Sequence, residues 1–169
     1  MPITRADDTA GFEPSALDWV RDHVARIIDT GTTDGVTIQG LPTVLMTYRG
    51  AKTGKLRKTP VMRVEHDGRY AAVASKGGMP ENPHWYASVA AEPVVELQDG
   101  TVTRTYRAHE ASGAEKELWW ARAVEAYPDY AVYQRNTDRQ IPLFVLEPTE
   151  PVEAVEAVEA VEAVEPKVS

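Results

Sequence analysis

The stretch VVELQDGTVTRTYRA, residues 94–108, holds two runs of strand-forming residues joined by Asp99-Gly100. Valine, threonine and tyrosine favour strands, and an Asp-Gly pair between such runs is the strongest short-range signal for a β-hairpin. The pair suits a type I′ turn, in which both central residues need a positive φ. The stretch therefore predicts two antiparallel strands, over residues 94–98 and 102–108.

A second Asp-Gly pair, Asp67-Gly68, joins the strand-like runs 58–66 and 69–75 in the same way, and further runs cover 43–49 and 141–147. Consecutive hairpins indicate an antiparallel sheet and argue against a doubly wound parallel fold. About six antiparallel strands with few helices leave exposed edges unless the sheet curls into a barrel. We therefore expect a mainly β protein with α insertions.

One helix is expected before the sheet and three short helical inserts within it. Residues 15–18, SALD, have the spacing of a capping box, and Thr30-Gly31 ends the helix that follows. Its apolar residues at helical intervals are Leu17, Val20, Val24, Ile27 and Ile28. Asn82-Pro83 begins a short helix with proline at the first position, Ser112 caps a second that runs to about residue 126, and residues 128–136 form a third.

The formal charge of −8 is concentrated at one end of the chain. Residues 149–169 carry six glutamates and one lysine, so the remaining 148 residues have a net charge of only −3. A nearly neutral body excludes a generally basic nucleic-acid binder. The Val-Glu-Ala repeat after residue 150 leaves no persistent apolar stripe on a helix, so we expect a disordered acidic tail over 149–169. With a flexible N-terminus over 1–12, the folded domain should cover 13–148.

Several kinds of site and location are excluded or disfavoured. The absence of cysteine excludes disulfides, thiolate metal sites and cysteine nucleophiles. Histidines 23, 66, 84 and 109 share no metal-ligand spacing, so no metal is expected and each should lie at the surface or at a helix end. No Gly-x-Ser-x-Gly motif surrounds Ser75. The longest apolar run, residues 70–74, is too short to span a membrane, and the N-terminus is acidic, so we expect a cytoplasmic protein.

Residues 49–58, RGAKTGKLRK, hold five cations and no acid between two predicted strands. Gly50 and Gly54 allow backbone N–H groups to turn toward a ligand, but the spacing is not that of a Walker A loop, because Leu56 follows the lysine. A plain basic hairpin would look similar. A second Gly-Lys segment, residues 75–78, follows the next hairpin, and it favours a site in which both loops face one polyanionic ligand.

Tyr127, Tyr130 and Tyr133 recur at intervals of three. On one helix they would form a single aromatic face, because residues three apart are neighbours on a helical surface. Such a face either packs in the core or lines a pocket for a flat molecule. The spacing alone leaves both interpretations open.

The segments ASKGG (74–78), NPHWY (82–86) and AEP (91–93) resemble the deazaflavin-dependent nitroreductase family, whose members use reduced coenzyme F420. GAKTGKLR (50–57), AYPDYAVYQ (126–134) and TDRQIP (137–142) follow in that family's order and spacing. The resemblance covers about residues 17–148. It implies a split β-barrel of the FMN-binding type, which agrees with the hairpins.

The resemblance also implies residue roles. Cofactor binding is implied for Lys52, Thr53, Gly54, Arg57, Lys58, Pro60, Ser75, Lys76, Gly77, Gly78, Trp85 and Tyr86. Contact with the acceptor is implied for Met62, Tyr127, Tyr130 and Tyr133. Ser75, Tyr130 and Tyr133 would be catalytic, because a hydroxyl can stabilise negative charge that develops on an acceptor oxygen. Ala51, Met62 and Ser88 depart from the residues usual in the family, and the first two bear on the range of acceptors more than on the cofactor.

The implied activity is hydride transfer from reduced coenzyme F420 to a planar quinone-like or nitroaromatic acceptor. The cationic loop 49–58 suits that cofactor's anionic tail. Two alternatives remain open, an FMN-dependent split-barrel oxidoreductase and a non-catalytic deazaflavin carrier. An oligonucleotide-binding barrel is disfavoured, because only Tyr48 accompanies the basic loop. We expect no nucleic-acid partner, and at most a peripheral contact with the inner face of the membrane.

Overall fold

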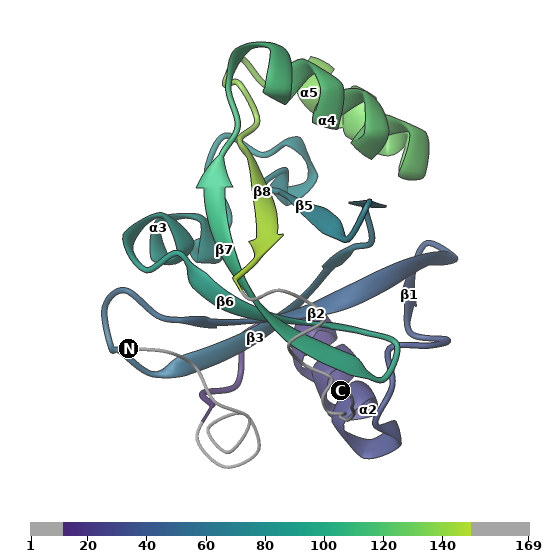
Figure 1. Ribbon diagram of the computed structural model, residues 1–169, viewed down its shortest axis with the longest axis vertical. Coiled ribbons are helices and arrows are strands. Elements are labelled where there is room, and N and C mark those ends of the chain that lie inside the picture. The colour runs from purple at the N-terminus through teal and green to yellow at the C-terminus, as the bar shows by residue number, and fades with distance from the viewer. Residues whose placement is uncertain (1–11, 150–169) are drawn as a thin grey trace, which may run out of the picture.

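The computed structural model describes residues 12–149, so the expected flexible N-terminus and acidic tail lie outside the described residues except at Phe12 and Thr149. An eight-stranded antiparallel sheet runs in the order β1-β2-β6-β7-β8-β5-β4, and β3 also pairs with β2. The strands are β1 (Thr37–Ile38), β2 (Leu41–Arg49), β3 (Leu56–Met62), β4 (Glu65–His66), β5 (Arg69–Val73), β6 (Val94–Asp99), β7 (Val102–Glu110) and β8 (Leu143–Pro148). The sheet curls so strongly that β2 and β3 run across the direction of β7 and β8 (Figure 1).

All six predicted strand regions are found, but the single strand expected over residues 58–66 is wrong. The chain changes partners after Met62, because β3 pairs with β2 whereas β4 pairs with β5. At this corner Arg63 turns its side chain to Asp99, with Nε 2.9 Å from Oδ2, while Val64 is buried. Among the strands of the described part of the chain, β3 pairs only with β2, so no strand ladder closes the sheet between β3 and β5.

The two Asp-Gly turns differ in type. Asp67 and Gly68 have φ values of 54° and 80° and join paired residues His66 and Arg69, as a type I′ turn requires. In the hairpin of β6 and β7, Asp99 pairs with Val102, so the central residues are Gly100 and Thr101, and only the glycine has a positive φ, of 63°. That pattern belongs to a type II′ turn, and the type I′ turn predicted at Asp99-Gly100 is wrong.

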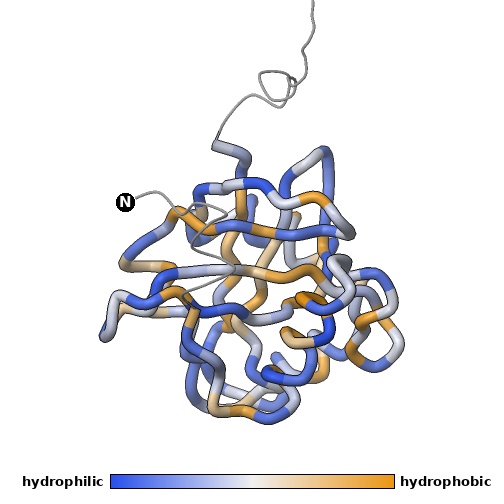
Figure 2. The backbone as a smooth tube through the Cα atoms, turned by 90° about the horizontal axis from the view of Figure 1, so that it is seen from below, coloured by the Kyte–Doolittle hydropathy of each residue, from blue (hydrophilic) through white to orange (hydrophobic). Residues whose placement is uncertain are grey.

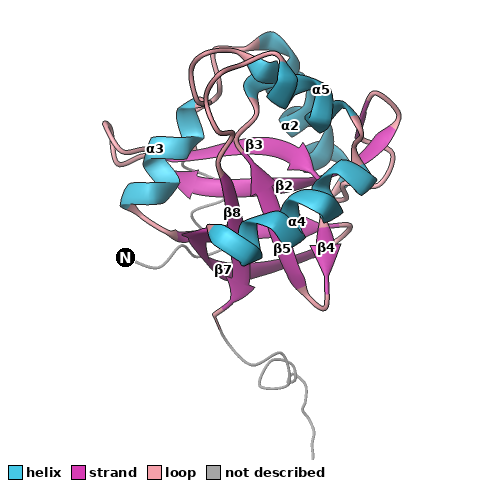
Figure 3. Cartoon of the chain, turned by 90° about the horizontal axis from the view of Figure 1, so that it is seen from above, coloured by secondary structure: helices cyan, strands magenta, loops and turns pink. Residues whose placement is uncertain are grey.

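All four predicted helices are present, and a short 3₁₀ helix was not predicted. The four predicted helices are α2 (Asp18–Thr30), α3 (His84–Ala91), α4 (Gly113–Ala126) and α5 (Asp129–Arg135), and the 3₁₀ helix is η1 (Lys76–Gly78). Gly31 ends α2 with φ 80°, as expected, and Pro83 directly precedes α3. Figure 3 shows these helices around the curled sheet, with α4 beside β5 and β8.

The capping box predicted for α2 is wrong. The Ser15 hydroxyl accepts from the nearby Leu17 N–H at 3.1 Å, and the helix begins only at Asp18, whose carboxylate contacts Arg21. The buried stripe of α2 is also narrower than the spacing suggested. Val20, Val24 and Ile27 are buried, whereas Leu17 and Ile28 are about half exposed.

The core has two main parts. One packs side chains of β2, β6 and β8, including Met46, Val95 and Leu146. The other packs α4 and α5 against β5 and β8 around Trp119, and hydrophobic segments accordingly cross the middle of the molecule in Figure 2. Met62, Tyr127 and Tyr130 belong to this second part, which places predicted acceptor residues at the border of the core. Among the described residues, no helix combines the length and apolar character needed to cross the bilayer.

Candidate active site

A cavity of about 280 Å³ opens where β3, η1, the start of α2 and the three tyrosines meet. The predicted site residues that line it are Arg57, Lys58, Pro60, Met62, Ser75, Lys76, Gly77, Trp85, Tyr127, Tyr130 and Tyr133. The curled sheet thus brings Arg57 and Lys58, which end the first basic segment and lie on β3, close to residues 75–77 of the second, and it sets the tyrosines beside them.

Five predicted cofactor residues do not line the cavity: Lys52, Thr53, Gly54, Gly78 and Tyr86. The first three are exposed in the loop between β2 and β3. Gly78 packs against the backbone of Tyr133 on α5. Tyr86 packs on Phe144 and donates its hydroxyl to Glu110 at 2.8 Å, so this ring faces a different part of the molecule.

The electrostatics of the cavity favour an anion. Within residues 12–149, its lining includes the cations Arg57, Lys58 and Lys76 and no carboxylate. Carboxylates outside the lining approach Arg57 and Lys76. Arg57 lies 3.6 Å from Glu13, and Lys76 lies 3.7 Å from Glu81. Both carboxylates are partly exposed, so the pairs are weak and an anionic ligand can compete for the cations.

Lys58 is held more firmly than the other two cations. It is buried, its Nζ donates to the Thr47 hydroxyl at 2.9 Å, and the same atom lies 5.5 Å from the centre of the Phe12 ring. Alternation along β3 explains the placement, because successive side chains of a strand point to opposite faces. Lys58 therefore faces inward between the more exposed Arg57 and Thr59.

The tyrosines do not share one helix face as predicted. Tyr127 ends α4, whereas Tyr130 and Tyr133 belong to α5, and the bend between the helices folds the three rings together. The rings of Tyr127 and Tyr130 meet edge to face with centroids 4.9 Å apart, and the hydroxyls of Tyr127 and Tyr133 lie 3.1 Å apart. Core packing is therefore confirmed for Tyr127 and Tyr130, which are buried and also line the cavity. That this cavity takes a flat molecule stays a prediction.

Two hydroxyls at the cavity lack a protein partner. Within residues 12–149, no hydrogen bond reaches the hydroxyl of Tyr130 or of Ser75, which is 9% exposed. Burial raises the pKa of Tyr130 well above its usual value, and the neighbouring Tyr127 and Tyr133 reinforce the shift. The Tyr130 hydroxyl thus stays protonated at neutral pH and can donate to a ligand.

Sequence reasoning missed several residues of the lining: Ser15, Leu17, Trp19, Val20, Ile38, Tyr48, Thr59, Val61, Val73, Pro83 and His84. One signal was available on α2. Trp19 is an apolar residue that lies off the stripe of Val20 and Val24, and it remains 48% exposed. Leu17, which was expected to belong to that stripe, precedes the helix and is 52% exposed. His84 is an exposed helix-end residue as expected, yet it also lines the cavity.

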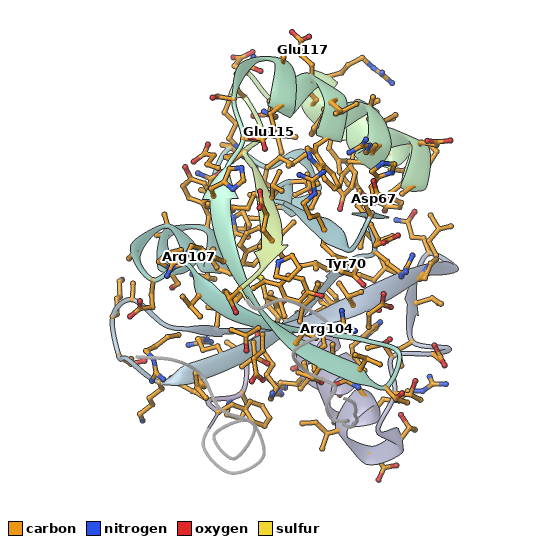
Figure 4. The ribbon with its side chains drawn as sticks, viewed as in Figure 1. Asp67, Tyr70, Arg104, Arg107, Glu115 and Glu117 are labelled. Atoms are coloured by element: carbon orange, nitrogen blue, oxygen red, sulfur yellow. The ribbon has the colours of Figure 1, made fainter. Side chains whose placement is uncertain are left out.

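The fold also assembles a group that sequence spacing did not indicate. Potential ligand atoms of His109, Glu115 and Glu147 lie within 4.8 Å of one another, away from the cavity lining. His109 Nε2 on β7 lies 2.9 Å from Glu115, which stands in the first turn of α4 (Figure 4). The three come from β7, α4 and β8, so no short motif could reveal them. A hydrogen bond between the His109 imidazole and the Glu115 carboxylate accounts for the closeness of these two groups.

Several known proteins resemble this chain in sequence and in structure. A sequence profile of the F420H(2)-dependent quinone reductase family matches residues 19–148. An F420H(2)-dependent quinone reductase of Mycobacterium tuberculosis is 33% identical over 133 residues, which cover 75% of this chain and 88% of that protein. A solved F420-H2-dependent reductase is 55% identical over 63% of this chain and 94% of its own, with a TM-score of 0.60. A solved structure described as a domain-swapped dimer is 54% identical over 79% of this chain and 100% of its own, with a TM-score of 0.63.

The fold and the family together define a split-barrel oxidoreductase that uses a deazaflavin cofactor. The chain belongs to the F420H(2)-dependent quinone reductase family. The expected split β-barrel, the oxidoreductase class and reduced coenzyme F420 as cofactor are thereby confirmed. The two alternatives, an FMN-dependent oxidoreductase and a non-catalytic deazaflavin carrier, do not agree with this family.

Proposed function

We propose that this enzyme passes a hydride from reduced coenzyme F420 to a planar quinone-like acceptor that lies against Tyr127, Tyr130 and Tyr133. The observation that carries the proposal is the combination of three cations, a wall of aromatic rings and two hydroxyls that have no hydrogen-bond partner within residues 12–149, all around one cavity. A nitroaromatic is also planar and also gains charge on oxygen, so the same groups would accept it.

The residues of the cavity fit this cofactor. Its anionic tail matches the charges of Arg57, Lys58 and Lys76, and charge-assisted hydrogen bonds to such groups are the stronger kind. Its flat ring head matches apolar walls such as Val73 and Trp85. A volume of about 280 Å³ lies near the lower end of small-molecule sites, which suits a ring system without its tail. The tail would then begin beside the cations of the cavity and continue along the exposed loop that carries Lys52 and Thr53.

When bound, reduced coenzyme F420 supplies the hydride, which is two electrons and one proton. The chain has to hold the acceptor flat and keep water from the reacting atoms. Tyr127 and Tyr133 fix each other through their hydroxyls, 3.1 Å apart, so this side of the wall cannot turn freely. Tyr130 is buried beside them, so the three tyrosines exclude water from their side of the cavity.

A quinone that has received a hydride needs one further proton to become a hydroquinone. Negative charge therefore develops on a carbonyl oxygen until that proton arrives. The Tyr130 and Ser75 hydroxyls can each donate a hydrogen bond to this oxygen, and preorganised donors of this kind lower the barrier. Water at the open side of the cavity provides the proton.

We further propose that the enzyme works in the cytoplasm and meets the membrane at most peripherally. Leu17 and Trp19 support such a contact, because both are about half exposed at the edge of the cavity. Exposed apolar residues of this kind can rest on the interfacial region of a bilayer.

The test is anaerobic titration of the full chain with coenzyme F420, with FMN in parallel, followed by mixing of the reduced complex with menadione or a nitroaromatic. We expect binding of F420 in preference to FMN and rapid return of the oxidised cofactor's fluorescence with menadione. Tighter binding of FMN would contradict the cofactor site, and stable reduced cofactor in the presence of every quinone would contradict the acceptor.

A further inference from the structure

Arg139 lies in the segment between α5 and β8, and its guanidinium reaches back to residues 74–82. Nε donates to the Met79 carbonyl at 2.9 Å and Nη2 to the Ser75 carbonyl at 2.8 Å. Nη1 donates to the Ala74 carbonyl at 3.2 Å and to the Asn82 side-chain oxygen at 2.7 Å. One side chain therefore holds both ends of the loop that contains Ser75 and Lys76.

The loop held in this way has an unfavourable backbone. Lys76, Gly77 and Gly78 have φ values of 45°, 65° and 82°, so three successive residues lie in the left-handed region. Glycine adopts this region readily, but a lysine does so at a cost in conformational energy. Such a conformation persists only where the surrounding structure holds it. Within residues 12–149, the four contacts of Arg139 are the side-chain hydrogen bonds that hold it.

The same segment is fastened to α5. Gln134 donates from Nε2 to the Arg139 carbonyl at 2.7 Å, and its Oε1 accepts from the Ile141 N–H at 3.0 Å. On the other side of the loop, Gly78 approaches Tyr133 so closely that an added Cβ would lie 2.8 Å from the Tyr133 carbonyl oxygen. The loop and α5 thus form one packed unit.

We propose that Arg139 is a positioning residue that sets the shape of the loop from Ser75 to Gly78 and holds it in register with the tyrosines of α5. Arg139 does not line the cavity, so it acts through the loop rather than on the ligand. The inference rests on the proposed function, because it assumes that this loop contacts the cofactor.

A role of Arg139 that depends on the planar shape of its guanidinium and a role that depends only on its charge predict different results for Arg139→Lys. A guanidinium offers a planar fork of donors, whereas an ammonium is a compact point charge that cannot reach four spread acceptors. If Arg139 served only to attract an anion, Arg139→Lys would behave like the wild type. If it sets the loop, Arg139→Lys should resemble Arg139→Ala.

The experiment compares Arg139→Lys and Arg139→Ala with Arg107→Ala, which removes an exposed arginine on β7 (Figure 4). Hydrogen exchange without cofactor reports on the amides of Gly78 and Met79, which donate to Ser75 and Lys76 in the loop. F420 fluorescence gives the dissociation constant, well below the melting temperature and at several salt concentrations.

We expect both Arg139 variants to expose the Gly78 and Met79 amides selectively. They should also weaken F420 binding by about 10- to 100-fold, the equivalent of one or two charged hydrogen bonds. Arg139→Lys should leave the salt dependence of binding unchanged, because the ligand's own contacts remain. Arg107→Ala should alter neither readout.

Asn82→Ala provides a milder variant, should the Arg139 variants fold poorly. It removes one of the four acceptors and should raise exchange at Met79 with a smaller loss of affinity. Normal loop protection in either lysine or alanine variant would overturn the inference, as would normal F420 binding by a well-folded Arg139→Lys. Failure of the wild type itself to bind F420 would instead overturn the proposed function.

Discussion

At the scale of single residues, the Tyr130 hydroxyl is the donor that we propose for catalysis. Tyr127 and Tyr133 bond to each other, whereas within residues 12–149 nothing bonds to the Tyr130 hydroxyl. We expect Tyr130→Phe to lower menadione turnover, by up to about 10²-fold if this donor faces the charged oxygen. Affinity for F420 should stay within about two-fold, because no charge is lost.

The matched control is Tyr106→Phe. Tyr106 is also buried, but it packs edge to face against Tyr70 and does not line the cavity. Tyr106→Phe should therefore leave menadione turnover unchanged. Equal turnover in Tyr130→Phe and the wild type, with Ser75→Ala also active, would assign both hydroxyls to packing.

A second prediction concerns the cations and their carboxylate neighbours. Arg57→Ala and Lys76→Ala should each weaken F420 binding by about 10- to 100-fold, since each removes a charge-assisted contact. Glu13→Gln and Glu81→Gln should have the opposite effect, because these carboxylates lie 3.6 and 3.7 Å from the same cations and compete with the ligand.

Fluorescence titration at low and high salt measures these effects. The gain from either glutamine variant should be at most a few-fold, as the pairs are partly exposed, and it should disappear at high salt. Weaker binding by both glutamine variants would show that the carboxylates orient the cations rather than compete for them.

At the scale of elements, the loop between β2 and β3 is anchored by α3. The buried Ser88 hydroxyl accepts from the Ala51 N–H at 3.0 Å, which ties an otherwise exposed basic loop to the helix. We expect Ser88→Ala to reduce the free energy of unfolding by about 1 kcal/mol, the value of one such hydrogen bond. It should also speed hydrogen exchange at Ala51.

Ser112→Ala is the comparison for this prediction. The sequence predicted that Ser112 caps α4. Ser112 does directly precede the helix, but its side chain makes no capping hydrogen bond, so the predicted cap is wrong. Its replacement should therefore cost less than the usual value of about 1 kcal/mol for a capping serine. Urea denaturation of the two variants checks the order, and a larger loss in Ser112→Ala would contradict it.

At the scale of the whole molecule, buried tyrosines should make stability fall at alkaline pH. Burial raises the pKa of Tyr70, Tyr127 and Tyr130, and hydrogen bonding to Asp99 raises that of Tyr70 further. An unfolded tyrosine has a pKa of about 10, so above that pH the unfolded chain releases protons that the folded protein retains. The free energy of unfolding should then decrease by about 1.4 kcal/mol per pH unit for each such tyrosine.

Urea denaturation between pH 8 and about 11.5 measures this slope across the usual tyrosine pKa. Tyr130→Phe removes one titrating group, so its slope above pH 10 should be shallower by about 1.4 kcal/mol per pH unit. A slope identical to that of the wild type would mean that Tyr130 ionises in the folded protein.

Local patterns determined much of the fold. The Asp-Gly pairs predicted both hairpins, and Gly31 predicted the end of α2. Each of these features needs a residue with a positive φ, and glycine adopts that conformation whatever the rest of the fold does. Strand boundaries were harder. The run 58–66 is uniformly strand-forming, and only the tertiary structure divides it at Met62, where the chain leaves β2 for β5.

For the candidate site, the sequence by itself determined the kinds of residue: cations beside glycines, tyrosines at regular spacing, and the motifs of a deazaflavin-dependent family. The tertiary structure decided which of them meet. It left Lys52 at the tip of a loop, folded Tyr127 onto α5, and added Trp19 and Arg139 from segments distant in the chain. A sequence pattern reports the conformation of neighbouring residues, whereas contacts such as that between Arg139 and Ser75 depend on how the whole sheet curls.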